Sequence, residues 1–245
     1  MAVHYRTQGF VLKKENLREA DQLFTIYTRD FGKLKILGKA IRKIKSKLRG
    51  SLRFPYLSEI EFIQGKTYKT LTDTILIENF PGIRKDLRKL KIIYQIADIL
   101  DNLIKGQELD EKIWNLLNEV LNQLNNLKLE VRDWELEIIY YYWLWNFLSV
   151  LGYQPELYNC SLCQKKLKPE KLYWNPREGG IICNNCSEKL KNSWLGIDPN
   201  TIKVLRLILK KEYSVLKKLK IGKANQEKLE AISTNFLSYI SSQIS

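Results

Sequence analysis

The chain has 245 residues, of which 44% are hydrophobic, so it can bury a substantial core and is not disordered throughout. Lysine and arginine total 41 against 27 aspartate and glutamate, and the formal net charge of +14 favours a polyanionic partner such as nucleic acid over a surface that is merely rich in lysine. The two ends carry the excess, because the net charge is +8 over residues 1–80, −2 over 81–150 and +8 over 151–245.

No segment of the sequence has the pattern of a targeting or membrane-spanning element. The first residues, MAVHYRTQGFVLKK, lack the charged and then apolar regions of a secretory signal. The most apolar stretch, 136–151, is short for a bilayer and contains Glu137 and Asn146, so it predicts a buried helix. We therefore expect a cytoplasmic protein without membrane contact, whose four cysteines sit in a reducing compartment and favour metal over disulfides.

The first 80 residues predict β-structure. Short runs rich in β-branched and aromatic residues recur there with partial alternation, at 8–13, 22–28, 33–37, 56–63 and 69–77. Gly32, after Arg29 and Asp30, marks a tight turn between the second and third runs. Five short strands suit a small barrel, and periodicity alone leaves an OB-fold and an SH3-like barrel both open.

After Pro81 and Gly82 the hydrophobic period changes to that of helices. Two apolar stripes, over 92–103 and 113–124, are followed by a segment at 131–151 that is apolar nearly all round and should be the central helix of a bundle, with Gly152 as its stop. Helix resumes at Asp198 and Pro199, a good N-cap and first position. The predicted class is α+β with several domains: an OB-fold at 1–80 and an all-α domain at 81–245, with an inserted module at about 156–192.

The inserted module carries all four cysteines, as two C-x-x-C pairs separated by 19 residues. This spacing is typical of a structural zinc site with four thiolate ligands, in which each pair forms a small knuckle. A redox dithiol pair is the competing interpretation. We expect one Zn²⁺ per chain in a closed, non-catalytic site. The predicted ligands are Cys160, Cys163, Cys183 and Cys186.

A basic stretch, 33–53, contains nine lysines and arginines and no acidic residue. So many like charges repel one another unless a polyanion lies nearby, although a solvated loop is the plain alternative. Flanking aromatic residues suit the way OB-folds hold single strands, but several of them must fill the barrel. The predicted DNA contacts are Lys33, Lys35, Lys39, Arg42, Lys43, Lys47 and Arg49. A second lysine cluster at 210–223 is as well explained by a solvated face as by DNA contact.

Catalytic signatures are missing from the sequence. The one histidine, His4, lies near a terminus, and no phosphate-binding G-x-x-x-x-G-K-[ST] loop is present. Asp21 and Asp30 do not form the carboxylate cluster of a two-metal nuclease. We therefore expect a protein without enzyme activity, while a metal-dependent nuclease and a zinc-ribbon RNA-binding protein remain as alternatives.

An ordered set of motifs resembles the RecO family of bacterial recombination mediators. The first part contains Gly9–Lys13, Glu19-Ala20-Asp21, Thr28-x-x-Phe31-Gly32-Lys33, Gly38–Arg42, Ser46–Leu52, Phe54-Pro55 and Leu71-Thr72. The second part contains Leu151-Gly152-Tyr153-x-Pro155, the cysteine pairs and Gly179-Gly180. The family often has Pro-Phe where this chain has Phe54-Pro55, and the far C-terminus offers little to match.

The resemblance implies an OB-fold, a helical domain and a zinc module. It also implies a DNA repair protein of homologous recombination that binds single- and double-stranded DNA and anneals complementary strands. The implied partners are RecR and the acidic C-terminal tail of the single-strand-binding protein SSB, and the implied outcome is loading of RecA on SSB-coated DNA. We expect a monomer on its own, associated with the bacterial nucleoid.

Overall fold

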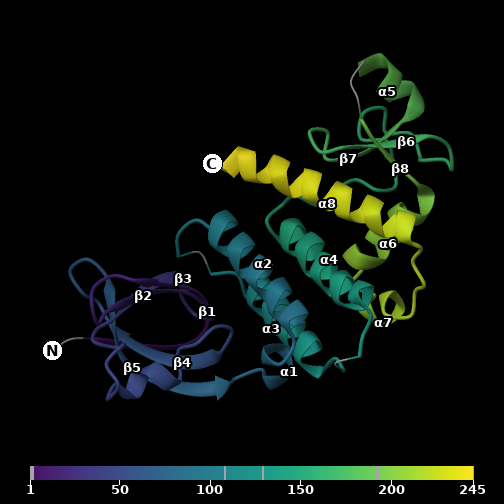
Figure 1. Ribbon diagram of the computed structural model, residues 1–245. Helices are drawn as coiled ribbons and strands as arrows, with labels where there is room; N and C mark the ends of the chain where they lie inside the picture. The colour runs from purple at the N-terminus through teal and green to yellow at the C-terminus, as the bar shows by residue number, and fades with distance from the viewer. Residues whose placement is uncertain (1–2, 108, 129, 191–193, 245) are drawn as a thin grey trace. The chain divides into compact units, whose positions relative to one another are not determined.

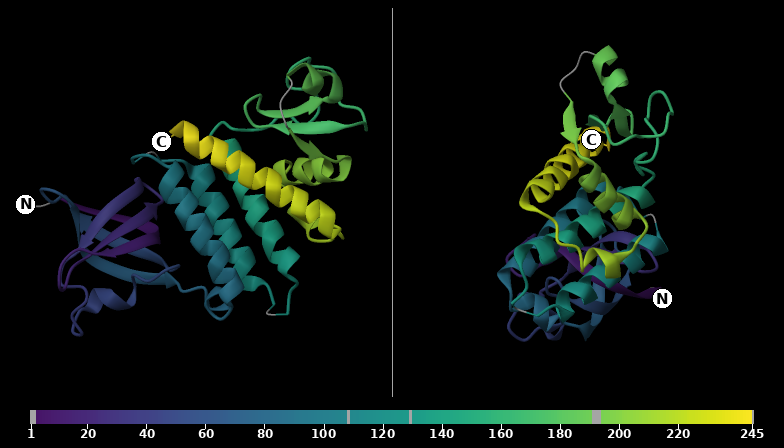
Figure 2. Two further views of the ribbon diagram at one scale, coloured as in Figure 1. Left: turned by 45° about the horizontal axis from the view of Figure 1, so that its top comes forward. Right: turned by 90° about the vertical axis from the view of Figure 1, so that its right-hand side faces the viewer.

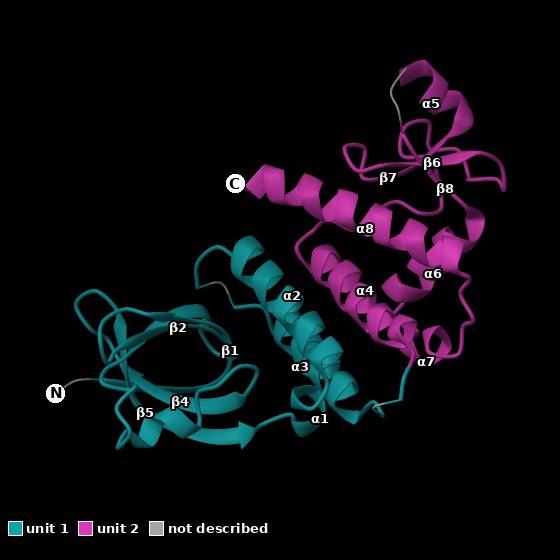
Figure 3. Ribbon diagram, in the orientation of Figure 1, with its two compact units in different colours: residues 1–131 teal, residues 132–245 magenta. Residues whose placement is uncertain are grey.

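The computed structural model describes residues 3–107, 109–128, 130–190 and 194–244 (Figure 1). The chain forms two compact units, residues 1–131 and 132–245 (Figure 3). The α+β prediction is confirmed, because a five-stranded sheet precedes the helices. The predicted domain boundary at residue 80 stays a prediction. Unit 1 contains β1 (His4–Asn16), β2 (Gln22–Thr28), β3 (Gly32–Gly38), the 3-10 helix η1 (Lys47–Gly50), β4 (Leu57–Ile63), β5 (Lys69–Glu78), α1 (Pro81–Arg84), α2 (Leu87–Leu103) and α3 (Glu111–Asn126).

The five strands of unit 1 close into a barrel in the order β1-β2-β3-β5-β4 (Figure 2). The long strand β1 pairs antiparallel with both β2 and β4, and a register shift between Val11 and Lys13 bends it between these partners. The contact of β3 with β5 is parallel and short, through Ile36 and Leu37. The closed barrel of five strands agrees with the small barrel expected from the sequence, and its assignment as an OB-fold stays a prediction.

Alternating side chains fill the barrel. In β3, Leu34 and Ile36 point inward and are buried, while Lys35 between them is exposed. Gly32, with φ of 62°, makes the predicted β2–β3 turn. The Thr28 hydroxyl fixes that turn by donating to the Gly32 carbonyl at 2.8 Å and accepting from the Phe31 N–H at 3.2 Å.

Helices α2 and α3 lie against the barrel within unit 1 (Figure 2). Each begins at an aspartate whose carboxylate accepts backbone N–H bonds: Asp86 for α2 and Asp110 for α3. Their apolar stripes are buried as predicted, and Trp114 of α3 packs on the barrel residues Phe10 and Tyr27, with ring centroids 5.0 and 6.5 Å away.

Unit 2 is built around α4 (Asp133–Val150), which is buried nearly all round as predicted. Its end is also as predicted, because Gly152 follows with φ of 93°. The Asn146 amide inside this helix donates to the carbonyls of Tyr142 and Ile208, so its burial is compensated. After the cysteine module the unit continues with α6 (Pro199–Leu209), α7 (Tyr213–Leu216) and α8 (Lys223–Ile244), and Asp198 caps α6 as expected.

The cysteine module within unit 2 has regular structure that the sequence analysis did not predict. A three-stranded antiparallel sheet in the order β7-β6-β8 contains β6 (Leu172–Asn175), β7 (Gly180–Cys183) and β8 (Leu195–Ile197). Helix α5 (Asn184–Leu190) follows β7 directly. These strands are only three or four residues long, too short for periodicity to distinguish them from loop.

Candidate metal centre and nucleic-acid interface

The four predicted cysteine ligands come together in the module. Their Sγ atoms all lie within 4.8 Å of one another. The sulfurs of Cys163 and Cys183, from different C-x-x-C pairs, are 3.9 Å apart. Four thiolates around a tetrahedral ion with bonds of ~2.3 Å would have their sulfurs about 3.8 Å apart. The cluster could therefore hold a metal ion with little rearrangement.

Backbone N–H groups favour the thiolate form of one of the four cysteines, Cys160. Burial raises the pKa of the Cys160 thiol, but N–H groups of Cys163, Cys183 and Leu162 point at its sulfur and bring the pKa down to about 6. The Cys183 N–H lies 3.4 Å from that sulfur. Burial and the neighbouring sulfurs raise the pKa of Cys186 to about 12. One thiolate is thus favoured by backbone donors, while the fourth would need a cation to ionise at neutral pH.

Gly180 permits the two knuckle segments to approach each other. A Cβ atom there would lie 2.3 Å from the carbonyl oxygen of Glu156, closer than real contacts allow. The backbone of Glu156 uses this space, since its N–H donates to Gly179 and its carbonyl accepts from Ile181. A further bond from the N–H of Ser161 to the Ile181 carbonyl, at 2.9 Å, places the first knuckle beside the second.

A buried aromatic cluster attaches the module to the helices of unit 2. Trp174 of β6 packs edge-on against Trp145 of α4 and Phe236 of α8, with centroid distances of 5.6 and 5.1 Å. The Trp145 indole donates to the Ser233 hydroxyl at 2.9 Å. These aromatics therefore pack a core, as expected for α4, and orient the module without forming a ligand box.

The predicted basic residues lie along β3, the loop after it and η1. Six of the seven are exposed: Lys35, Lys39, Arg42, Lys43, Lys47 and Arg49. None of these six has an ion pair or a side-chain hydrogen bond within the part of the chain that the structure describes. Their charges are therefore directed to solvent and available to a polyanion.

Lys33 differs from the other six predicted contacts. Its side chain is only 14% exposed, and its ammonium group donates to the backbone carbonyl and the carboxylate of Asp101 in α2, at 2.5 and 3.1 Å. Both contacts are internal to unit 1. Lys33 therefore joins the barrel to a helix, which periodicity could not reveal because Asp101 is 68 residues away in sequence.

The loop after β3 is held by the segment that contains the Glu-Ala-Asp motif. Asp21 accepts a hydrogen bond from the Ala40 N–H at 2.7 Å, and the Arg42 N–H donates to the Ala20 carbonyl at 3.0 Å. Ala40 takes a positive φ of 51°, an unusual conformation that the Asp21 bond stabilises. Ile41 between them is buried in the barrel core. These contacts therefore hold the first residues of the loop after β3, called here the basic loop, in one position.

The structure shows which of the five aromatic residues flanking the basic stretch are buried and which lie near the surface. Phe24 lies in the barrel core, Phe31 packs against it, and Tyr27 is buried under Trp114. Tyr56 is buried and its hydroxyl accepts from Arg84 at 2.8 Å. Phe54 alone of the five stacks on a partly exposed ring, that of Tyr94 in α2.

A hollow of about 530 Å³ lies beside this stacked pair. Among its charged and aromatic lining residues, three were not predicted as site candidates: Lys14 of β1, Arg53 and Tyr94. Tyr94 falls off the apolar stripe of α2, so an aromatic residue on the polar face of that helix was the available signal. Lys14 carried no signal, because exposed lysines on a β-strand are ordinary.

Within the described ranges, the four cysteines form the one group of histidine, cysteine or carboxylate side chains suited to a metal ion. The lysines at 210–223 are exposed on unit 2 around α7. No helix among the described residues is long and apolar enough to cross a membrane.

Comparison with known proteins gives one family over nearly the whole chain. The profile described as Recombination protein O N terminal matches residues 1–80, and Recombination protein O C terminal matches residues 84–241. The DNA repair protein RecO of Dehalococcoides mccartyi strain CBDB1 is 31% identical over 234 residues, which cover 94% of this chain and 88% of the relative. The DNA repair protein RecO of Caldanaerobacter subterraneus subsp. tengcongensis is 27% identical over 233 residues, covering 95% and 91%.

Proposed function

This chain belongs to the RecO family of DNA repair proteins, and from that premise we propose that it binds DNA through the basic loop of its barrel and anneals complementary strands. Family membership confirms the resemblance seen in the ordered motifs, and a RecO-family protein is a DNA repair protein without catalysis of its own, as predicted. The observation that carries the proposal is the unpaired basic segment on a closed five-stranded barrel.

Annealing follows from charge and geometry. Two strands repel each other through their phosphates, and a cationic surface lowers that repulsion by neutralising phosphate charge. The release of condensed counterions favours its binding. The base edges stay accessible because lysine and arginine bind the phosphate backbone. The proposed phosphate contacts are the exposed residues of the basic stretch: Lys35, Lys39, Arg42, Lys43, Lys47 and Arg49. Lys33 is left out, because Asp101 engages its ammonium group.

The metal in the module is proposed to be zinc, one ion per chain, held by the four cysteines. Thiolate ligands in a tetrahedron suit Zn²⁺, and a site closed by four protein ligands stabilises a fold without leaving a position for substrate. Atomic emission spectroscopy on protein purified without added metal should find close to one zinc per chain. Reduced, folded protein that repeatedly contains no metal would contradict this assignment.

The partners are proposed from family membership. We infer complexes with RecR and with the acidic C-terminal tail of SSB, and a role in loading RecA on SSB-coated single strands at the bacterial nucleoid. The exposed lysines at 210–223 offer a basic surface on unit 2 that suits an acidic peptide. Binding of SSB lacking its C-terminal tail as tightly as intact SSB would contradict this part of the proposal.

The test of the proposed function is strand annealing on SSB-coated DNA. Complementary fluorescent oligonucleotides are coated with SSB and mixed with and without the protein. We expect faster annealing, lost when Lys43 and Lys47 are replaced by glutamate. Annealing that is no faster with the protein than without it, although the protein binds DNA, would contradict the proposal. Cleavage of the oligonucleotides with magnesium, or tighter binding to structured RNA than to single-stranded DNA, would instead favour the nuclease or the RNA-binding alternative.

A further inference from the structure

The hollow beside the basic loop has the lining of a nucleotide site. Its volume of about 530 Å³ lies within the range of roughly 300 to 1,000 Å³ that small-molecule sites occupy. Four cations and no acidic residue line it. The lining consists of Lys14, Gln22, Phe24, Ile41, Arg42, Arg49, Leu52, Arg53, Phe54 and Tyr94.

The cations of this hollow lack internal partners. Lys14, Arg42, Arg49 and Arg53 are exposed, and no ion pair or side-chain hydrogen bond engages them within the described part of the chain. Four positive groups around one hollow repel each other. A bound anion would offset this repulsion, which water and salt only screen. Arg42, Arg49 and Arg53 also have the guanidinium fork that matches two oxygens of a phosphate.

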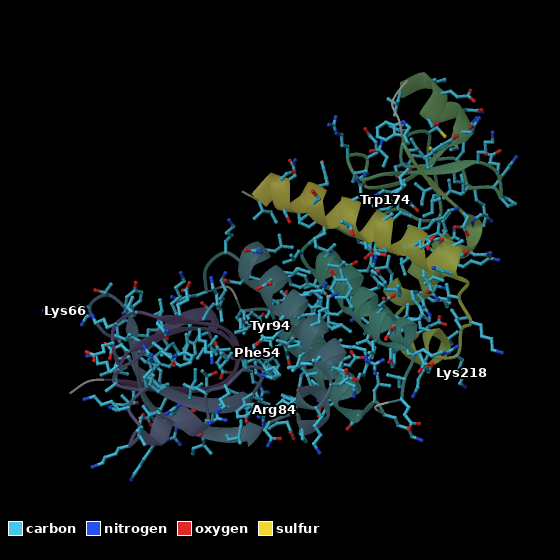
Figure 4. The ribbon with its side chains drawn as sticks, viewed as in Figure 1. Phe54, Lys66, Arg84, Tyr94, Trp174 and Lys218 are labelled. Atoms are coloured by element: carbon cyan, nitrogen blue, oxygen red, sulfur yellow. The ribbon has the colours of Figure 1, made fainter. Side chains whose placement is uncertain are left out.

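One wall of the hollow is a pair of stacked rings from different elements. The centroids of Phe54, which precedes β4, and Tyr94 of α2 lie 4.1 Å apart, with planes inclined by 15° (Figure 4). Phe54 is half-buried, but Tyr94 remains 54% exposed. An exposed aromatic ring already held parallel by a neighbour is a preorganised platform for another flat ring.

Three side chains of the barrel core also line the hollow. Phe24, Ile41 and Leu52 line it and also belong to the barrel core, where each is at most 4% exposed. The apolar surface open to a ligand therefore comes mainly from the Phe54–Tyr94 pair, and a ligand that combines a flat ring with a flanking anion suits both this pair and the surrounding cations. A nucleotide is such a ligand, since its base can stack while its phosphate meets arginine.

We propose that this hollow binds one unpaired nucleotide of a DNA strand, with the base on the Phe54–Tyr94 stack and the adjacent phosphates on Arg42, Arg49 and Arg53. The inference rests on the proposed DNA binding and adds a preference for single strands. Bases in a duplex are stacked on each other and paired, so they do not reach the platform without being flipped out. Tyr94 makes α2 part of the interface along with the barrel.

Removing the platform tests the inference. Tyr94→Ala should weaken binding of a single-stranded oligonucleotide by at least about 5-fold, because a stacked base contributes ~1–3 kcal/mol and each 1.4 kcal/mol is tenfold. Affinity for duplex of the same sequence should stay within about 2-fold. Tyr94→Phe should retain wild-type affinity. Leu87→Ala is the matched control, since Leu87 is 83% exposed on the same helix but does not line the hollow.

Two further measurements separate stacking from charge. Oligonucleotides with abasic sites should bind wild type more weakly, while Tyr94→Ala should bind normal and abasic strands alike. 2-Aminopurine in the strand should be quenched on binding to wild type and less so with Tyr94→Ala. Equal losses on single strands and duplex, or the same abasic penalty in both proteins, would overturn the inference while the proposed DNA binding stands. Absence of salt-dependent DNA binding by wild type would instead remove the proposed function itself.

Discussion

The ammonium group of Lys33 on β3 lies 3.1 Å from the carboxylate of Asp101 on α2 and joins the barrel to the helix beside it. Both side chains are largely shielded, with 14% and 26% of their surfaces exposed. Lys33, the first residue of the basic stretch, therefore contributes its charge to the fold, although the basic residues that follow it in the stretch remain free. The basic stretch therefore divides into one internal contact and a set of surface cations.

Replacing Lys33 should affect stability more than DNA binding. Lys33→Met should lower the free energy of unfolding by about 1 to 2 kcal/mol, because Asp101 loses a charged hydrogen-bond donor. Lys35→Met is the matched control on the same strand, and a surface substitution there should stay within about 0.5 kcal/mol. Denaturant unfolding measures both. An opposite order, with Lys35 the more costly, would show that the Lys33–Asp101 pair does not form in solution.

Replacing Asp21 should weaken DNA binding even though it removes a negative charge. Asp21→Ala deletes the acceptor that holds Ala40 at positive φ, so the basic loop loses its fixed start. Glu19→Ala removes the same charge from an exposed residue nearby and should leave the affinity equal or slightly higher. Fluorescence anisotropy at one salt concentration compares the three proteins. Tighter binding by Asp21→Ala would mean that charge alone governs the loop and that Asp21 does not position it.

Two glycines of the module should respond differently to alanine. Gly180→Ala brings a Cβ within 2.3 Å of the Glu156 carbonyl, so the knuckles must move apart and the metal should be held more weakly. Gly196→Ala, on β8 of the same sheet, meets no atom within 4 Å and should be tolerated. Metal content after dialysis against a mild chelator, together with the melting temperature, gives the comparison. Equal metal retention by the two variants would argue against the close approach at Gly180.

The sequence predicted the parts of this fold that repeat a pattern. All five barrel strands were found from runs rich in β-branched and aromatic residues, and in β3 the alternation matches the buried and the more exposed faces of the strand, whereas β2 is buried along nearly its whole length. The long helices α2, α3 and α4 were found from their apolar stripes and from Gly152. The short strands β6 to β8 were missed, since elements of three or four residues carry too few positions for a period.

For the candidate sites too, local patterns were predicted and contacts made by long-range packing were not. Cysteine spacing alone predicted the four residues that the fold brings together. The position of Tyr94 beside Phe54 could not be predicted, because 39 residues separate them and only the packing of α2 on the barrel joins them. The contact of Lys33 with Asp101 could not be predicted for the same reason, since Asp101 is on that helix. Local patterns identify residue types, and long-range packing decides which of them share a surface.

The central claim, that the exposed cations of the basic loop bind the DNA backbone, is tested most directly by the salt dependence of binding. Reversing Lys43 and Lys47 to glutamate should weaken single-strand affinity and make the slope of log K against log salt shallower by about 1.4, since each phosphate contact contributes ~0.7. The matched control reverses Lys66 and Lys85, which are exposed on the same unit outside the basic stretch. We expect the control to keep the wild-type slope; equal slopes for wild type and the Lys43/Lys47 variant would contradict the account.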